Sequence, residues 1–159
     1  MEQENRADIA RRLVATTADL VVAIMIYRAF LLVSGNFVAG FGAGTFLLLR
    51  DSLDLFGKQG VSPGKWLLNM KVVCGRNQPC NHIASIKRNL SIALYFLLVS
   101  LLTLIFNFVP FVHPNLAVLL ACAIASIAMG METYKLLTDE TGLRLGDLLA
   151  DTQVVENNL

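Results

Sequence analysis

Two long stretches of the chain contain no charged residue. Lys, Arg, Asp and Glu are absent from Ala29 to Leu49 and from Asn89 to Met131. A helix of about 20 apolar residues crosses the hydrocarbon core of a bilayer, so the first stretch has room for one crossing and the second for two. Pro110 and Pro114 interrupt the second stretch, and they predict a tight hairpin between two spans.

An apolar segment near the N-terminus brings the predicted number of membrane-spanning helices to four. The predicted spans are 9–33, 37–53, 86–108 and 116–137. Only 16% of the residues are charged, against about a quarter in soluble domains. The second span is the weakest prediction, because its three glycines lower helix propensity. A re-entrant segment is the alternative there.

Small residues recur at four-residue spacing in two of the predicted spans. Gly40 and Gly44 form a G-x-x-x-G pattern, which lets another helix approach closely. The fourth span carries two comparable stripes, Ala117, Ala121 and Ala125, and Cys122, Ser126 and Gly130. Both patterns predict tight helix packing.

The loop 54–85 is polar and is predicted to contain a short helix. Ser62 followed by Pro63 is typical of an N-cap with proline at the first helical position. Trp66 beside Lys65 suits an amphipathic helix that lies at the membrane interface.

Two short alternating segments predict a small β element. One covers 69–74, and the other covers 151–156 in the tail 138–159. We expect them to pair beneath the membrane. The predicted fold class is therefore an all-α membrane protein, a single domain of residues 1–159, with four transmembrane helices, a small cytoplasmic amphipathic helix and a two-stranded β element.

Basic residues gather on one side of the predicted spans. The N-terminal end has three, the region 50–88 has seven and the tail has two, whereas the hairpin near Pro110 has none. By the positive-inside rule, both termini and the central loop are then cytoplasmic. The net charge is +1 and no basic stripe stands clear of the membrane segments, so we expect no nucleic-acid partner.

The three cysteines do not suggest a disulfide framework. Their number is odd, Cys122 lies in an apolar segment, and Cys74 and Cys80 fall in the loop predicted to be cytoplasmic. A reducing compartment is therefore expected. Cys74 and Cys80 also lack C-x-x-C spacing, so we expect no metal site.

No catalytic pattern is present in the sequence. The segment Gly60–Trp66 is similar to a phosphate loop only superficially, because Gln59 stands at the first glycine position and Trp66 replaces the magnesium-binding hydroxyl. No Ser-His-Asp or metalloprotease pattern occurs either. We therefore expect neither enzyme activity nor a cofactor.

Asp19 is the outstanding ionisable residue, because it stands well inside a predicted span and away from its ends. An Asp at the centre of a membrane helix costs about 2.5 to 3.5 kcal/mol on insertion scales, which makes it a functional hypothesis by default. Arg12 precedes it by two helical turns, about 10.5 Å, on nearly the same face. Asp19 is expected to face the bundle interior and bind a proton or cation. The alternative is a packing pin, paired with a cation or hydroxyl of another span.

The remaining polar residues near the spans suggest ordinary structural roles. Glu132 and Lys135 are three residues apart at the end of the fourth span, and we interpret them as an interfacial ion pair. His113 is expected to face solvent in the hairpin, and nothing marks His82 as a site residue.

Three motifs, in order along nearly the whole chain, resemble those of the RDD family of small bacterial membrane proteins, named for one arginine and two aspartates. They are Arg12-Leu-Val-Ala-Thr-Thr-Ala-Asp19-Leu, Ser62-Pro-Gly-Lys-Trp-Leu-Leu-Asn-Met-Lys-Val-Val73 and Arg144-Leu-Gly-Asp147-Leu-Leu-Ala-Asp151-Thr-Gln-Val-Val155.

The resemblance assigns roles to individual positions. Gly64 and Lys65 match the family's Gly-Lys segment, a structural motif, and Asp147 is the second aspartate. At two positions this sequence departs from the family's pattern. Gly146 occupies a position where histidine is frequent, and Asp151 one where glycine is usual.

The resemblance implies transport, with cation/proton antiport proposed for some members. We therefore expect a small transport protein of the bacterial inner membrane, in contact with lipid, that moves a monovalent cation or a proton. Asp19 would bind the ion, while Arg12 and Asp147 tune or gate it from the cytoplasmic side. Four helices leave little room for a pathway, so a homo-oligomer is expected.

Two other hypotheses remain open. In the first, the chain is a non-transporting membrane scaffold or accessory subunit, and the Arg and Asp residues hold the helices and their cytoplasmic part together. In the second, the segment around Trp66 handles lipid.

Overall fold

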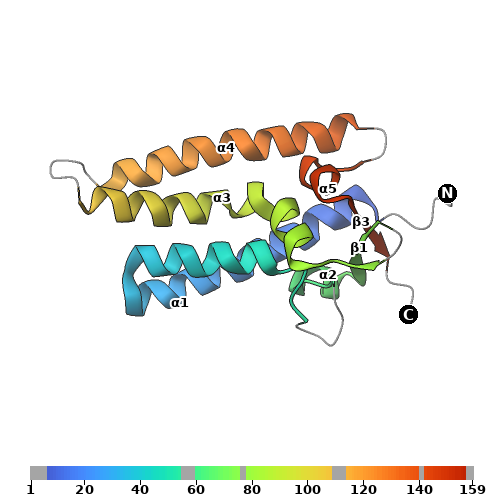
Figure 1. Cartoon of the computed structure of the whole chain (residues 1–159), viewed down its shortest axis with the longest axis horizontal. Coiled ribbons are helices and arrows are strands. Elements are labelled where there is room, and N and C mark those ends of the chain that lie inside the picture. Colours follow the sequence, from blue (N-terminus) through green and yellow to red (C-terminus); the bar gives the residue numbers. More distant parts are fainter. Residues whose placement is uncertain (1–6, 55–59, 76–77, 109–113, 140–141, 157–159) are drawn as a thin grey trace.

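Long helices run side by side, and smaller elements gather at one end of them (Figure 1). The computed structural model describes residues 7–54, 60–75, 78–108, 114–139 and 142–156. The long helices are α1 (Ile9–Leu49), α3 (His82–Phe106) and α4 (Pro114–Thr138). The elements at the end, which together form the polar cap, are α2 (Pro63–Leu67), α5 (Leu145–Ala150), β1 (Met70–Cys74), β2 (Gln78–Pro79) and β3 (Thr152–Glu156).

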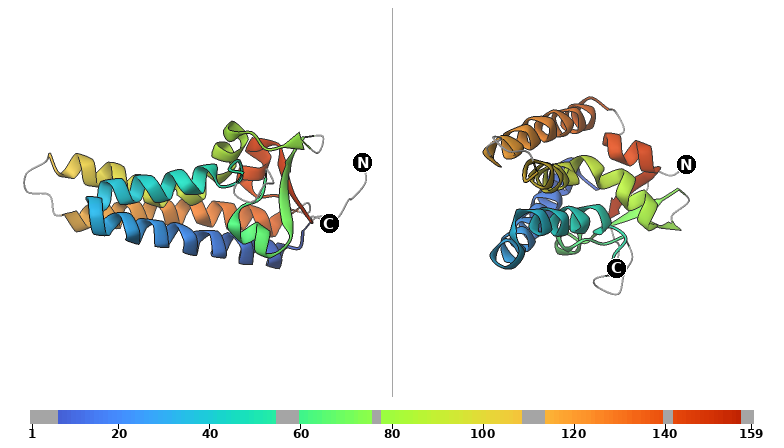
Figure 2. Two further views of the ribbon diagram at one scale, coloured as in Figure 1. Left: turned by 90° about the horizontal axis from the view of Figure 1, so that it is seen from below. Right: turned by 60° about the vertical axis from the view of Figure 1, so that its left-hand side comes forward.

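Helix α1 folds back on itself at Gly35. This glycine has φ 80° and ψ 176°, outside the helical region, and a positive φ favours glycine. The two arms lie side by side in both views of Figure 2, and the Tyr27 hydroxyl donates to Asn36 Oδ1 at 2.9 Å across the bend. Both ends of α1 therefore lie at the polar cap.

Within the described residues, three helices are long and apolar enough to cross a membrane. They are Ile9–Leu49, His82–Phe106 and Val118–Thr138. The predicted spans 9–33 and 37–53 correspond to the two arms of α1. The second arm, residues 36–49, is about 21 Å long, which is shorter than the roughly 30 Å hydrocarbon core. The arm does not by itself reach the length of a span.

Close packing of α1 on α3 explains the G-x-x-x-G pattern. A Cβ atom on Gly40 would lie 2.7 Å from the carbonyl oxygen of Phe96, and one on Gly44 would lie 2.7 Å from the Leu97 side chain. Only glycine allows this approach, so the pattern acts within the chain. Helix α3 also packs on α4, where Ala121 is buried.

The predicted strand pairing is confirmed. Strand β1 pairs antiparallel with β3, from Met70 opposite Glu156 to Cys74 opposite Thr152. The two-residue strand β2 adds a third member, in the order β2-β1-β3. Its two residues are too few for an alternating pattern, so the sequence did not predict β2.

The expectation about the cysteines is wrong. Cys74 and Cys80 form a disulfide, with their Cα atoms 5.3 Å apart, a usual separation for bonded cysteines. The antiparallel pairing of β1 with β2, with Cys74 opposite Gln78, brings the two cysteines together. The number and spacing of the cysteines give no sign of this bond, and they no longer support a reducing compartment.

Candidate functional site

Charged side chains gather where the long helices meet the polar cap. Three of them stand at the cap-side ends of the uncharged stretches, namely Arg50, Arg88 and Glu132. The fourth is Asp19, in the first arm of α1, which contacts Arg50. At most 6% of each is exposed. Buried charges persist in proteins when they are paired and hydrogen-bonded, so their partners define what this cluster can do.

Asp19 is enclosed by the first residues of α2. Its Oδ2 accepts a hydrogen bond from Ser62 Oγ at 2.6 Å, and its Oδ1 accepts one from Gly64 N at 2.7 Å. Arg50 Nη1 lies 3.1 Å from Oδ2. Both carboxylate oxygens are therefore engaged. A hydroxyl and a cation are the kinds of partner that the packing-pin alternative assigns to Asp19.

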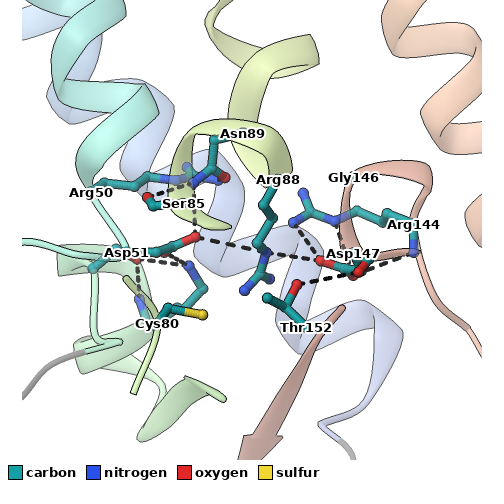
Figure 3. A network of polar contacts seen from close by, with 12 residues as sticks. Arg50, Asp51, Cys80, Ser85, Arg88, Asn89, Arg144, Gly146, Asp147 and Thr152 are labelled. Atoms are coloured by element: carbon teal, nitrogen blue, oxygen red, sulfur yellow. Dashed lines mark hydrogen bonds and ion pairs between the residues drawn. The ribbon is translucent and has the colours of Figure 1, made fainter. Parts of the chain in front are cut away.

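Asp51 is the centre of a second group of contacts, part of which is visible in Figure 3. Lys65 Nζ binds its Oδ1, Asn89 Nδ2 donates to its Oδ2 at 2.9 Å, and Arg88 Nε lies 3.7 Å from Oδ2. Asn89 Oδ1 in turn accepts from Arg50 Nη2 at 3.0 Å. Asn89 thus connects Asp51 with Arg50.

Asp147 binds arginines from three elements. Arg12 of α1 pairs with its Oδ2, and Arg88 Nε of α3 lies 2.8 Å from its Oδ1. Arg144 forms a capping box with Asp147 at the start of α5, with its Nη2 3.4 Å from Oδ1 (Figure 3). Arg12 Nη1 also donates to the Gly142 carbonyl at 2.6 Å. One carboxylate therefore ties α5 to two long helices.

Burial and neighbouring charge shift the pKa values of the cap residues in different directions. Burial raises the pKa of Asp51 and of Asp147, but the cations around them lower it by more, so both carboxyl pKa values lie well below the usual range. Burial lowers the pKa of Lys65 to about 7. The positive charges of Arg88 and Arg50 also lower this pKa, whereas the Asp51 carboxylate raises it. Lys65 therefore changes its charge near neutral pH.

Two glycines bring the polar cap into contact with the long helices. A Cβ atom on Gly64 would lie 2.0 Å from the Ala15 carbonyl oxygen, and one on Gly146 would lie 2.2 Å from the Arg88 carbonyl oxygen. The approach at Gly64 positions the Ser62–Lys65 turn against Asp19. The approach at Gly146 gives the departure from histidine a physical reason, because α5 lies against α3 without space for a side chain.

The residues predicted to form one site have different binding partners in the structure. Arg12 binds Asp147, whereas Asp19 binds the start of α2. Lys65, which the sequence placed at the interface, is buried against Asp51. Sequence reasoning missed four members of the network, Arg50, Asp51, Arg88 and Asn89. In the sequence they form two polar pairs, Arg50-Asp51 and Arg88-Asn89, at the ends of the uncharged stretches. The arginines of these pairs entered the prediction only as evidence for membrane topology.

The predicted ion pair of Glu132 with Lys135 is wrong. Glu132 Oε1 accepts from Ser91 Oγ at 2.7 Å and from Gly146 N at 3.1 Å. Lys135 binds Asp139 at 2.9 Å instead. The three-residue spacing is compatible with a pair, but Glu132 turns toward α3 and α5.

Of the two histidines, His82 lies at the start of α3 and contacts a serine. His82 Nδ1 lies 2.8 Å from Ser52 Oγ, a contact that anchors the start of α3. His113, like Pro110, lies outside the described residues, and the predicted hairpin falls largely there.

A cavity of about 60 Å³ borders the network. It lies between α1, α3 and α4, and its polar lining includes Lys65, Arg88, Glu132 and Arg144. Within the described residues, no group of three or more His, Cys, Asp or Glu could hold a metal ion.

Apolar helices of spanning length, closed at one end by a cap that is held through buried ion pairs, define a small integral membrane protein. The chain belongs to the RDD family, whose model matches residues 6–151. The match includes Arg12, Asp19 and Asp147. No curated protein and no solved structure matches the chain.

Proposed function

We propose that this chain is a membrane scaffold or accessory subunit, in which the buried charges fix the polar cap to the helices. The observation that carries the proposal is the environment of Asp19, whose two oxygens are taken by Ser62, Gly64 and Arg50. A cation could bind Asp19 only if Arg50 moved away. Removing one partner of a buried ion pair costs about 3 to 5 kcal/mol, which favours a structural role for Asp19.

The cap has exposed apolar side chains for such a role. Trp66 and Leu67 of α2 and Leu149 of α5 are each more than half exposed. Apolar side chains on a polar cap can contact the membrane interface or a protein partner. The distribution of Lys and Arg supports a cytoplasmic position for the cap and both termini in the bacterial inner membrane, whereas the disulfide opposes a reducing side.

Liposome reconstitution with the Asp19→Asn variant tests the proposal. We expect no cation-dependent movement of protons by the wild-type chain when Na⁺, Li⁺ or K⁺ is added outside. We also expect a lower yield of folded Asp19→Asn protein, because Arg50 loses its anionic partner there. Glu156→Gln is the matched control, since this partly exposed residue pairs only with the partly exposed Arg11 among the described ion pairs. Proton movement that is lost in a well-folded Asp19→Asn variant would contradict the scaffold proposal.

Transport of a monovalent cation or proton is the second candidate. It is favoured by one observation: Lys65, with a pKa of about 7, lines the same cavity as Glu132. In this case Lys65 is the titrating group of the cavity, and Arg12 and Asp147 support it. A homo-oligomer would complete the pathway, and the exposed side of α4 around Ser126 and Gly130 is open to a second copy. The same flux measurement, with native mass analysis of the assembly, tests this candidate.

A further inference from the structure

The cavity between α1, α3 and α4 has a positively charged lining. Glu132 is the one carboxylate of the described lining. The cationic side chains that line the cavity are Arg12, Lys65, Arg88 and Arg144. The side chains of Arg12 and Arg144 are 11% and 12% exposed, more than those of Lys65 and Arg88. These two arginines are therefore the cations that a molecule entering the cavity can approach most easily.

The carboxylates around the cavity leave one cation unbalanced when Lys65 is protonated. In the described cluster, the carboxylates are Asp19, Asp51, Glu132 and Asp147, and the cations are Arg50 and the four of the lining. A buried charge without a counter-charge is costly. The cavity therefore favours an anion over a cation.

Apolar side chains lie beside the charged ones on the side away from the polar cap. Each of the three long helices supplies one such neighbour to the lining. The neighbours are Leu13 beside Arg12, Ile92 beside Arg88 and Met129 beside Glu132. A molecule with a charged head and an apolar tail matches this order of side chains.

The cavity reaches the surface of the helices. Helix α3 lies between α1 and α4 (Figure 1), and the cavity is lined by residues of both outer helices that are also open to the outside. Leu13 is 48% exposed, Met129 is 39% exposed, and Thr133 is exposed as well. These residues belong to helices that are long and apolar enough to cross a membrane. Membrane lipids are therefore the molecules beside the opening.

We propose that this cavity binds one anionic phospholipid, whose phosphate enters toward Arg12 and Arg144 and whose acyl chains lie along α1 and α4. The volume of about 60 Å³ is several times what one water molecule needs, so the cavity has room for a phosphate group while the acyl chains stay outside. Basic pockets between membrane helices bind anionic headgroups in this way. The role goes beyond that of a scaffold, because it assigns a ligand class to the cavity.

Native mass spectrometry of the full chain, released from detergent, tests the proposal. We expect one phosphatidylglycerol to remain bound per chain, and phosphatidylcholine with the same acyl chains to bind about tenfold more weakly. Equal binding of the two lipids would overturn the proposal. Glycerol 3-phosphate has the charge but no acyl chain, so it should not displace phosphatidylglycerol at equal concentration. Displacement would show a site for free phosphate compounds and overturn the assignment to a lipid.

Two threonines of α4 provide a matched pair of variants. Each is exposed and donates its hydroxyl to the carbonyl four residues earlier at 2.8 Å, but of the two only Thr133 lines the cavity. Thr133→Glu places a carboxylate at the opening and should weaken phosphatidylglycerol binding about tenfold. Thr138→Glu should leave binding unchanged.

Thr133→Lys guards against a loss of binding that comes only from poor folding. It adds a cation at the opening and should strengthen phosphatidylglycerol binding, a gain that a badly folded chain cannot produce. Unchanged binding in both Thr133 variants, or an equal loss in Thr133→Glu and Thr138→Glu, would contradict the proposed site. Because lipid retention needs neither ion flux nor a protein partner, its failure is distinct from failure of the scaffold role.

Discussion

Asp151 has a backbone conformation that favours glycine. It follows α5 with φ 50° and ψ 52°, in the left-handed region. Left-handed residues after a helix are usually glycine, because a Cβ atom costs roughly 1 kcal/mol there. This explains why the resemblance places a glycine at the position. The aspartate is tolerated because short polar side chains visit this region more readily than others.

We predict that Asp151→Gly raises the free energy of unfolding by about 0.5 to 1 kcal/mol, since it removes the left-handed strain. Urea unfolding in detergent, followed by circular dichroism, measures the change. Asp151→Ala keeps the Cβ atom and should lower stability instead. A loss of stability in Asp151→Gly would mean that the carboxylate makes a contact worth more than the cost of the left-handed backbone conformation.

Lys65 should make stability depend on pH. Its pKa is about 7 in the folded chain and about 10.4 in an unfolded chain. Between these values the unfolded chain binds more protons, so stability rises as the pH increases from about 7 to about 10. The slope is at most about 1.4 kcal/mol per pH unit for one proton. Unfolding measured across this range should show the slope in wild type and lose it in Lys65→Gln; an equal slope in both would refute the assignment to Lys65.

At the scale of elements, contacts between backbones position the cap. Helix α2 approaches α1 at Gly64, where any Cβ atom would meet the Ala15 carbonyl oxygen at 2.0 Å. This approach presents the Gly64 N–H to Asp19. The start of α2 therefore depends on glycine and on the N-cap Ser62, whose hydroxyl also donates to Asp19.

Gly64→Ala should lower the free energy of unfolding by about 3 kcal/mol, at the upper end for overpacked sites. The reason is that the added methyl group would collide with backbone atoms of Ala15 rather than with a side chain that can move. Gly130→Ala is the matched control. A Cβ atom on Gly130 meets nothing within 4 Å, so alanine should raise stability by up to about 1 kcal/mol through helix propensity. Thermal or urea unfolding of both variants would show opposite signs. Equal effects would mean that α2 is free to move away from α1.

Local patterns predicted the elements, and distant contacts decided the site. Hydrophobic length located α3 and α4 to within a few residues, and alternation located β1 and β3. The N-cap at Ser62 was equally visible, because capping is a local interaction. The pairing of Asp19 with Ser62 and Arg50 was not visible, since it requires α1 to fold back and α2 to dock. Helical periodicity gave the face of Asp19 but no information about its partners.

At the scale of the whole molecule, the disulfide bears on which side of the membrane the cap occupies. Cys74 and Cys80 are bonded, and Cys122 is free and exposed. We predict that cells lysed in SDS with an alkylating reagent yield chains with one label, and with three labels after reduction. Intact mass measures both states, and Cys122→Ser should remove the first label. Three labels before reduction would show an open disulfide and agree with a reducing, cytoplasmic side.

Asp147 is the point where the molecule's parts depend on one another, because its carboxylate is shared by arginines of α1, α3 and α5. Asp147→Asn keeps the shape but leaves three arginines with a weaker partner in a site closed to solvent. We expect a loss of about 3 to 5 kcal/mol in the free energy of unfolding. Glu156→Gln, which breaks the partly exposed pair with Arg11, should cost no more than about 1 kcal/mol. Limited proteolysis of Asp147→Asn should cut near α5 and β3 before the long helices, because the cap loses its attachment first. If the two variants unfold alike, the arginines are held by water or lipid instead of Asp147, and the cap is attached chiefly by the approach of Gly64 and Gly146 to the long helices.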